Sequence, residues 1–334
     1  SVRKLLQTVY HNAGRKEKRN LSSPSFTKWK GYDIVNPSRL FAMREWNLKE
    51  SSITLLSNGC FRRKAVLSVM KLGFIGAGNM GSAIISGILN KGALPADCIY
   101  VSRKHPEKGA ELARKGVHIM KGNLSLVQAV DCVLLAVKPI YAADVIREAY
   151  DALNGKFVIS IIAGWTYETL KDALPDTARF VRVMPNTPLA VGEGMSLISS
   201  LCTCTDEEFD FAKSVFAAAG KVAVVEDHVY TPANGISGCG PAFVYAFIEA
   251  MADGGVRYGV PRALAYELAA QTLVGAAKMV LETGEHPGRL KDAVCSPGGT
   301  TIEGMYALEK GGMRAAVMDA VGATVEKTMR MAKK

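Results

Sequence analysis

The sequence lacks the residue patterns that mark metal, disulfide and covalent-nucleophile chemistry. Its five histidines show no metal-ligand spacing, and among its seven cysteines only Cys202 and Cys204 lie close together. A single C-x-C pair without a second pair or nearby histidines predicts neither a zinc site nor a disulfide framework. The chain after residue 69 also has no G-x-S-x-G elbow and no Walker lysine motif. We therefore expect no bound metal and a reducing compartment.

Long apolar runs and a charge excess in the body of the chain are also missing. The longest apolar candidate, 235–248, ends before Glu249 and is shorter than the ~18 residues that a membrane-spanning helix needs. The net charge of +10 comes from residues 1–69, which hold 14 Lys or Arg and 4 Asp or Glu, whereas the rest holds 27 of each sign. Because the body is neutral, we expect neither a nucleic acid nor a membrane as a partner.

Residues 1–69 show no sustained helix or strand period and contain basic runs at 15–19 and 62–64. Three interpretations stay open for this segment. It is a disordered tail, an organelle transit peptide, since it is basic and poor in acids, or sequence upstream of a natural start at Met70. We favour the first, and expect a basic, disordered extension on a cytoplasmic protein, with organelle targeting as the alternative.

From residue 70 to residue 227, short apolar strand patterns alternate with helix patterns. Such alternation predicts an α/β fold, a Rossmann-type doubly wound parallel sheet with helices on both faces. The expected strands lie at 71–75, 99–102, 132–137, 157–162, 180–183, 195–198 and 221–225, and the expected helices at 80–90, 106–115, 142–153, 166–174 and 205–220.

From residue 228 to residue 334 the pattern is helical, and its helices are rich in Ala and Gly, as at 269–270 and 275–277. A small helical domain of this kind has apolar faces to spare and commonly completes its core with a second subunit. We expect an all-helical domain for substrate binding and dimerisation, in a homo-oligomer rather than a monomeric cap.

The most informative motif is G-x-G-x-x-G at Gly76, Gly78 and Gly81, between a strand pattern and a helix pattern. In a dinucleotide-binding unit Gly76 allows the tight turn, Gly78 lets the backbone approach a pyrophosphate, and Gly81 lets helix and strand pack closely. The phosphates then lie on the free N–H groups of the helix start. The motif therefore predicts a nucleotide cofactor.

Residues that end the expected strands refine this prediction, because ligands bind at the carboxyl ends of such strands. The strand at 99–102 ends in Ser102 and Arg103, without the acid that binds the 2′-hydroxyl of NAD, which favours NADPH over NADH. The alternative is that Arg103 is a solvated loop charge. Lys138 and Ala163 follow the next two strands and are placed near the cofactor.

Two polar loops are candidates for ligand contacts. Asn186, in the rigid loop at 184–188, offers hydrogen bonds to cofactor or substrate, with a plain turn as the alternative. The segment 296–301 (SPGGTT) places two glycines and three hydroxyl residues at a helix start, which makes an anion cradle. It suits a substrate carboxylate, and the alternative is a capped helix with a glycine turn.

Together these motifs make residues 70–334 resemble the pyrroline-5-carboxylate reductase family. The matching stretches are 73–81 (GFIGAGNMG), 136–139 (AVKP), 160–164 (SIIAG), 182–188 (RVMPNTP), 238–242 (GCGPA), 252–255 (ADGG), 286–288 (HPG), 290–292 (LKD) and 296–301 (SPGGTT). The resemblance implies NADPH- or NADH-dependent reduction of the cyclic imine Δ1-pyrroline-5-carboxylate to L-proline, the final step of proline biosynthesis. It also implies interleaved dimers, often assembled into decamers.

The resemblance and the strand ends together give a set of expected site residues. The substrate is expected at 296–301, with Thr301 as the candidate donor near the imine nitrogen. The substrate set is Ser296, Gly298, Gly299, Thr300 and Thr301, and the cofactor set is Gly76, Ala77, Gly78, Asn79, Met80, Gly81, Ser102, Arg103, Asn123, Ala136, Val137, Lys138, Pro139, Ala163 and Asn186.

Two other classes of function compete with this one. A β-hydroxyacid dehydrogenase has a similar two-domain layout and uses a helical lysine as acid–base group, for which Lys278 is the candidate. The second is a non-catalytic NADP-binding sensor. The segment 296–301 favours imine reduction over both, and Lys278 is then a solvated or structural lysine.

Overall fold

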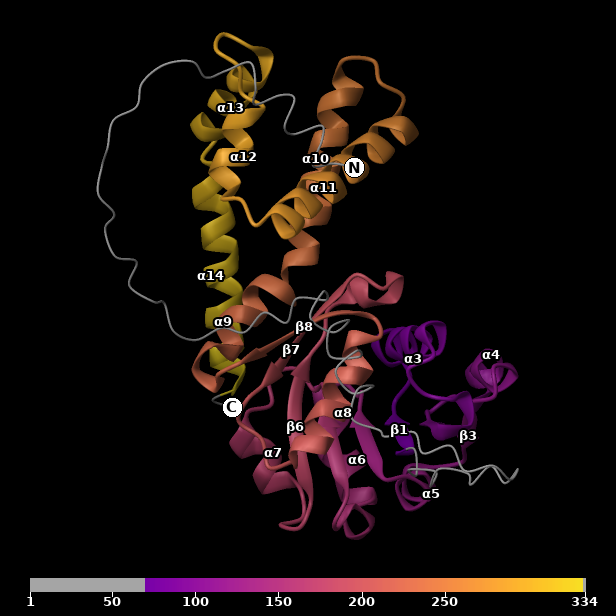
Figure 1. The fold of residues 1–334 in the computed structure, drawn as a ribbon. Helices are drawn as coiled ribbons and strands as arrows, with labels where there is room; N and C mark the ends of the chain where they lie inside the picture. Colours follow the sequence, from indigo (N-terminus) through magenta and orange to yellow (C-terminus); the bar gives the residue numbers. More distant parts are fainter. Residues whose placement is uncertain (1–69, 333–334) are drawn as a thin grey trace, which may run out of the picture. The chain divides into compact units, whose positions relative to one another are not determined.

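The computed structural model describes residues 70–332, so the expectation for residues 1–69 lies outside the described part of the chain. Its first half is an eight-stranded sheet in the order β3-β2-β1-β4-β5-β6-β7-β8 (Figure 1). Neighbouring strands are parallel except β6 and β7. The strands are β1 (Leu72–Ile75), β2 (Ile99–Ser102), β3 (His118–Met120), β4 (Cys132–Leu135), β5 (Phe157–Ser160), β6 (Arg179–Met184), β7 (Gly194–Ser199) and β8 (Gly220–Val225).

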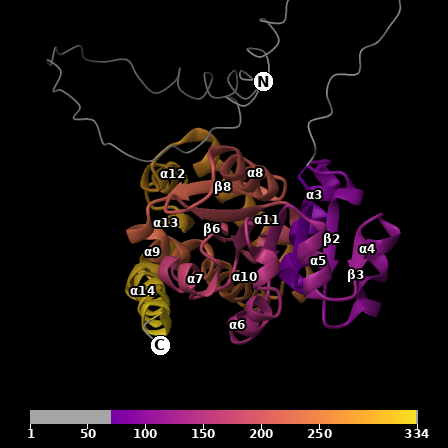
Figure 2. The same ribbon diagram turned by 90° about the horizontal axis from the view of Figure 1, so that it is seen from below.

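Helices cover both faces of this sheet (Figure 2). One apolar core holds Ile84 and Phe216, and the other holds Leu126 and Leu170. Strands β1, β4 and β5 are buried on both faces, which is why they are continuous apolar runs in the sequence. The expected fold class is confirmed, with one antiparallel pair added. The helices are α3 (Asn79–Lys91), α4 (Ala110–Arg114), α5 (Asn123–Ala129), α6 (Pro139–Glu148), α7 (Tyr167–Ala173) and α8 (Asp206–Ala217).

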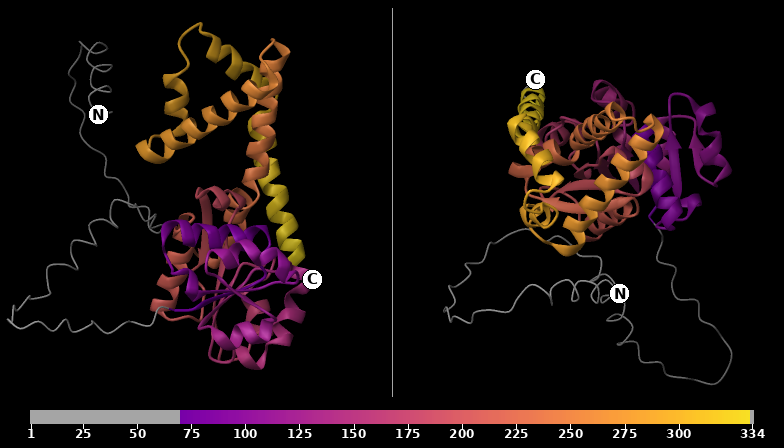
Figure 3. Two further views of the ribbon diagram at one scale, coloured as in Figure 1. Left: turned by 90° about the vertical axis from the view of Figure 1, so that its right-hand side faces the viewer. Right: turned by 90° about the horizontal axis from the view of Figure 1, so that it is seen from above.

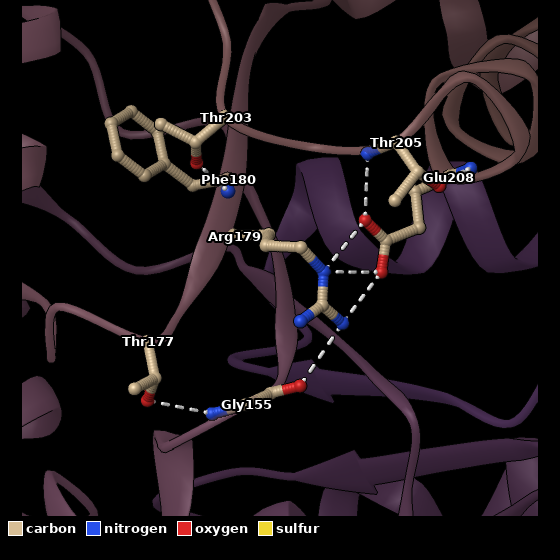
Figure 4. Close-up of polar contacts among 7 residues, drawn as sticks. All are labelled: Gly155, Thr177, Arg179, Phe180, Thr203, Thr205 and Glu208. Atoms are coloured by element: carbon tan, nitrogen blue, oxygen red, sulfur yellow. Dashed lines mark hydrogen bonds and ion pairs between the residues drawn. The ribbon is translucent and has the colours of Figure 1, made fainter.

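A forked ion pair secures the amino end of β6 (Figure 4). The Arg179 guanidinium donates to both carboxylate oxygens of the buried Glu208, at 2.8–3.0 Å, and to the carbonyl oxygen of Gly155 at 3.0 Å. Glu208 also accepts from the Thr205 amide and completes a capping box at the start of α8. Since bidentate pairs fix orientation as well as position, this contact holds α8 against the sheet.

The second half of the described chain is helical. Helix α9 packs on β7, α14 packs along α9, and α10 and α11 form an antiparallel hairpin (Figure 3). Few of its side chains are buried, and apart from Tyr230 on α9 they are small, such as Ala252, Ala265 and Ala269. Large apolar side chains stay exposed in the single chain. The helices are α9 (Asp227–Ser237), α10 (Gly240–Arg257), α11 (Arg262–Thr283), α12 (Pro287–Ala293), α13 (Thr300–Lys310) and α14 (Met313–Ala332).

Among the described residues, the helical stretch Asp227–Arg257 is long and apolar enough to cross a membrane by length and composition alone. Only 11% of its apolar part is buried within the single chain. The apolar run at 235–248 stops before Glu249, whereas the helical stretch continues past this charged residue to Arg257. Because so little of α9 and α10 (Gly240–Arg257) is buried within one chain, these helices do not form the core of a single subunit. Their apolar surface is left for a partner.

Candidate cofactor and substrate site

The glycine turn after β1 has the geometry that a nucleotide loop requires. Gly76 has a φ of 90°, and a Cβ there would lie 2.6 Å from the carbonyl oxygen of Ala136. Its amide donates to the carbonyl oxygen of Ser102 at 2.8 Å, which ties the turn to the end of β2. A side chain at Gly76 is therefore excluded by both conformation and space.

The other two glycines differ in what surrounds them. A Cβ at Gly81 would lie 2.6 Å from the carbonyl oxygen of Gly76, so this glycine lets α3 start close to the turn. A Cβ at Gly78 would meet nothing within 4 Å. The backbone at Gly78 is thus open to a ligand at the start of α3, where amide groups and the helix dipole favour an anion. The glycine turn at 76–81 and the amides at the start of α3 therefore fit a dinucleotide pyrophosphate.

Strand register brings the other expected cofactor residues to the same edge. Ile75 pairs with Ser102 on one side and with Leu135 on the other, and Leu135 pairs with Ser160. The segments that follow these four residues therefore leave the sheet side by side. They contain the glycine turn at 76–81, Arg103, the 136–139 segment and Ala163. Lys138 is exposed at the start of α6, and Ala163 is exposed beside Gly164.

Asn123, which only the resemblance places in the site, lies next to the end of β2. The Ser102 hydroxyl donates to Asn123 Oδ1 at 2.7 Å. Ser102 is buried, and Asn123 is the first residue of α5. The structure thus joins two expected cofactor residues that are 21 positions apart in the sequence.

Asn186 is buried and holds the loop after β6 in place. Its Nδ2 donates to the carbonyl oxygen of Ser237 at 2.9 Å, and its Oδ1 accepts from the Met195 amide at 2.8 Å. These contacts join the loop to β7 and to the end of α9. The amide is therefore engaged in structure, as in the plain-turn alternative, and its contact with a cofactor stays a prediction.

The segment 296–301 forms a turn into α13, with Gly298 at a φ of 68°. The Gly299 amide donates to the carbonyl oxygen of Ser296 at 3.0 Å, and Gly299 is the N-cap of α13. Thr300 and Thr301 are exposed as its first two residues. An N-cap without a side chain leaves the first amides of this helix open to an anion.

Sequence reasoning missed the role of Arg182, a buried guanidinium that joins the sheet to the helical half. It forms an ion pair with Asp227 at the start of α9 and lies 4.5 Å from the ring centre of Tyr230. It also donates to the carbonyl oxygen of Trp165, at 3.5 Å, just after Ala163. Burial raises the pKa of the Tyr230 hydroxyl. The sequence did contain a signal for the role of Arg182, because this charged residue lies within the otherwise apolar strand pattern at 180–183.

Within residues 70–332, no group of three His, Cys, Asp or Glu side chains lies close enough to hold a metal ion. Lys278, the acid–base candidate of the rival class, is exposed on α11. The sheet, its open glycine turn and the helical half with exposed apolar faces define the class of two-domain NAD(P)-dependent oxidoreductases.

Comparisons with known proteins point to one family within this class of oxidoreductases. Residues 227–331 match a family profile described as pyrroline-5-carboxylate reductase dimerisation, and residues 71–164 match one described as NADP oxidoreductase coenzyme F420-dependent. Pyrroline-5-carboxylate reductase of Escherichia coli is 43% identical over 265 residues, which cover 79% of this chain and 98% of the relative. The enzyme of Pisum sativum is 41% identical, with 78% and 95% covered.

Solved structures agree with the sequence relatives. The crystal structure of Plasmodium falciparum pyrroline carboxylate reductase with NADP bound has a TM-score of 0.73 and 34% identity, covering 79% of this chain and 98% of that chain. The chain belongs to the pyrroline-5-carboxylate reductase family. The family, the oxidoreductase class and the use of a nicotinamide dinucleotide are therefore confirmed, and the dimerisation match gives the exposed apolar helices a partner in a second subunit.

Proposed function

We propose that this protein reduces Δ1-pyrroline-5-carboxylate to L-proline with NADPH or NADH, the final step of proline biosynthesis. Family membership supports the reaction, and the observation that carries its chemistry is the open amide cradle at Gly298 and Gly299 before α13. A carboxylate binds there through charge-assisted hydrogen bonds to backbone amides. We assign substrate binding to Ser296, Gly298, Gly299, Thr300 and Thr301.

The cofactor, when bound, supplies the hydride that the imine carbon accepts. The chain binds and orients the two reactants, and a protonated imine nitrogen is already a good electrophile, so positioning supplies much of the rate. Thr301 donates a hydrogen bond near the imine nitrogen. Because a hydroxyl is a poor acid, water is the source of the proton on the imine nitrogen, and hydride addition to this protonated imine gives the neutral secondary amine.

We assign residues 70–227 to the nucleotide-binding domain and 228–334 to the substrate-binding and dimerisation domain, with residues 1–69 as a separate extension. The six free cysteines in the described part of the chain fit a reducing compartment. We propose a cytoplasmic location, with organelle targeting by residues 1–69 as the alternative. The proposed cofactor contacts are Gly76, Ala77, Gly78, Asn79, Met80, Gly81, Ser102, Arg103, Asn123, Ala136, Val137, Lys138, Pro139, Ala163 and Asn186.

One assay tests the proposed activity. The purified full chain is incubated with Δ1-pyrroline-5-carboxylate and NADPH, and both the loss of absorbance of the reduced cofactor and the formation of L-proline are followed. Equal amounts of both changes are expected. Cofactor binding without turnover would instead indicate a sensor, and turnover of a β-hydroxyacid alone would indicate the rival dehydrogenase.

The Arg103 side chain is expected to favour NADPH over NADH. A charge-assisted contact to the 2′-phosphate contributes about 1.5–3 kcal/mol, so Arg103→Ala should lower kcat/KM with NADPH about ten- to a hundredfold and with NADH much less. Lys104→Ala, which removes the neighbouring exposed charge, is the matched control and should change both values little. Equal losses with the two cofactors in Arg103→Ala would contradict the assignment.

The exposed apolar faces of α10 and α11 are expected to be covered by a second subunit. Tyr245 is 58% exposed and Leu268 is 54% exposed in the single chain. Monomeric proteins rarely expose large contiguous apolar patches to water. Light scattering at micromolar concentration should therefore find no stable monomer. It should find dimers, and we propose decamers as the larger assembly. A fully active monomer would contradict this expectation.

A further inference from the structure

Two hydrogen bonds in series connect the end of β2 to helix α6. The Ser102 hydroxyl donates to Asn123 Oδ1 at 2.7 Å, and Asn123 Nδ2 donates to Glu148 Oε2 at 2.7 Å. Ser102 is buried and ends β2, Asn123 begins α5, and Glu148 ends α6. No motif in the sequence points to Glu148, and the reaction described above does not use it.

The chemistry of the groups fixes the direction of this chain of hydrogen bonds. An ionised carboxylate only accepts hydrogen bonds, so Glu148 must face the NH2 group of Asn123. The carbonyl oxygen of the Asn123 amide then faces Ser102, whose single hydroxyl proton is used on it. Ser102 is left with lone pairs and without a proton for a ligand. Glu148 therefore determines, through Asn123, that Ser102 is an acceptor.

Ser102 lies where dinucleotide-binding folds distinguish the two cofactors, at the 2′ position of the adenosine ribose. The 2′-hydroxyl of NADH has a proton to donate to the Ser102 lone pairs. The 2′-phosphate of NADPH presents acceptor oxygens, which the same lone pairs repel, while the cation of Arg103 attracts them.

We propose that Glu148 is a specificity-determining positioning residue, which presets Ser102 as a hydrogen-bond acceptor and so favours NADH against the opposite preference of Arg103. The inference rests on the proposed function, since it assumes that the dinucleotide lies on this edge. Glu148, acting through Ser102, and Arg103 therefore work in opposite directions. Together they set the ratio of kcat/KM with NADPH to kcat/KM with NADH.

Glu148→Gln tests the proposal, because a Gln amide accepts or donates. Its NH2 group donates to Asn123 Oδ1 after the Asn123 amide turns over, so that Asn123 then donates to Ser102 and releases the Ser102 proton for a phosphate. At pH 8 the ratio of kcat/KM with NADPH to kcat/KM with NADH should rise about three- to tenfold. The change should arise in KM and in the Kd from cofactor fluorescence, with kcat near its wild-type value.

Asp144→Asn is the matched control. Asp144 lies one turn earlier on α6, is exposed, and pairs with Arg147 at 3.0 Å, so its loss removes the same charge without touching Asn123. Its cofactor ratio should match the wild type. A second variant, Glu148→Ala, frees the Asn123 amide and should raise the ratio in the same direction, and melting temperatures check that all three variants are folded.

Two results would overturn the proposal. The first is an unchanged cofactor ratio in folded Glu148→Gln and Glu148→Ala. The second is an equal rise in Asp144→Asn, which would show a general effect of charge. Wild-type protein that binds neither dinucleotide would instead overturn the proposed function, and Kd values for wild-type protein separate that outcome from the other two.

Discussion

Gly299→Val is expected to raise the KM for Δ1-pyrroline-5-carboxylate about ten- to a hundredfold, the loss of one charge-assisted contact of about 1.5–3 kcal/mol. A Cβ at Gly299 would lie 2.5 Å from Ser296 Oγ and 3.1 Å from the carbonyl oxygen of Ser296. A branched side chain thus pushes the turn apart and covers the amides at the start of α13. The change is measured by steady-state kinetics with substrate varied at saturating NADPH.

Gly304→Ala provides the control within the same helix. A Cβ at Gly304 meets nothing within 4 Å, so alanine there should leave the substrate KM unchanged. NADPH binding, followed by fluorescence, should stay near the wild-type value in both variants, because the glycine turn at 76–81 is untouched. A folded Gly299→Val enzyme with a normal substrate KM would move the carboxylate site elsewhere.

The buried part of the fold could be predicted from the sequence because burial leaves a clear pattern. The expected strand at 99–102 coincides with β2, and the expected strand at 71–75 begins one residue before β1. The start of α8 was also predictable, since Thr205 with acids in the first turn is a local cap signal, and the structure forms the full capping box. These features depend on residues near each other in the sequence.

The short elements at the sheet edge could not be predicted in the same way. Strand β3 has three residues, none of them fully buried, so it leaves no apolar run. Helix α5 has seven residues, too few for a clear period. The expected helix at 142–153 is in fact α6, which begins at Pro139, followed by a 3-10 turn at Asp151–Leu153. Pro139 is a favourable first helical residue, a signal that was available.

The candidate site shows the same division between local and distant information. The positive φ of Gly76 and the close approach of Gly81 to the carbonyl oxygen of Gly76 are features of one turn, and sequence spacing predicts them. The contacts of Arg182, Asn186 and Glu148 join residues that are 9 to 51 positions apart. Such contacts depend on how α6 and α9 pack against the sheet. Side-chain direction, which decides whether an amide or a hydroxyl donates, therefore required the structure.

Thr301→Ala is expected to lower kcat about tenfold and also to weaken substrate binding. We propose that its hydroxyl lies near the imine nitrogen, where charge changes during hydride transfer, so the hydrogen bond should be stronger in the transition state than in the ground state. Threonines in other helices use their hydroxyls locally: Thr272 and Thr283 each donate to the carbonyl oxygen four residues earlier. Within residues 70–332 the Thr301 hydroxyl has no such partner.

The different hydrogen bonding of Thr301 and Thr272 allows a purely structural role for the Thr301 hydroxyl to be tested. If the hydroxyl acts on the substrate, Thr301→Ser keeps the donor and should restore most of kcat, while Thr272→Ala, which removes a hydroxyl bonded within its own helix, should leave kcat unchanged. Single-turnover rates at saturating substrate and NADPH separate the chemical step from binding. Unchanged kcat and KM in Thr301→Ala would mean that this hydroxyl takes no part in the reaction, and the donor to the imine nitrogen would then have to be water alone.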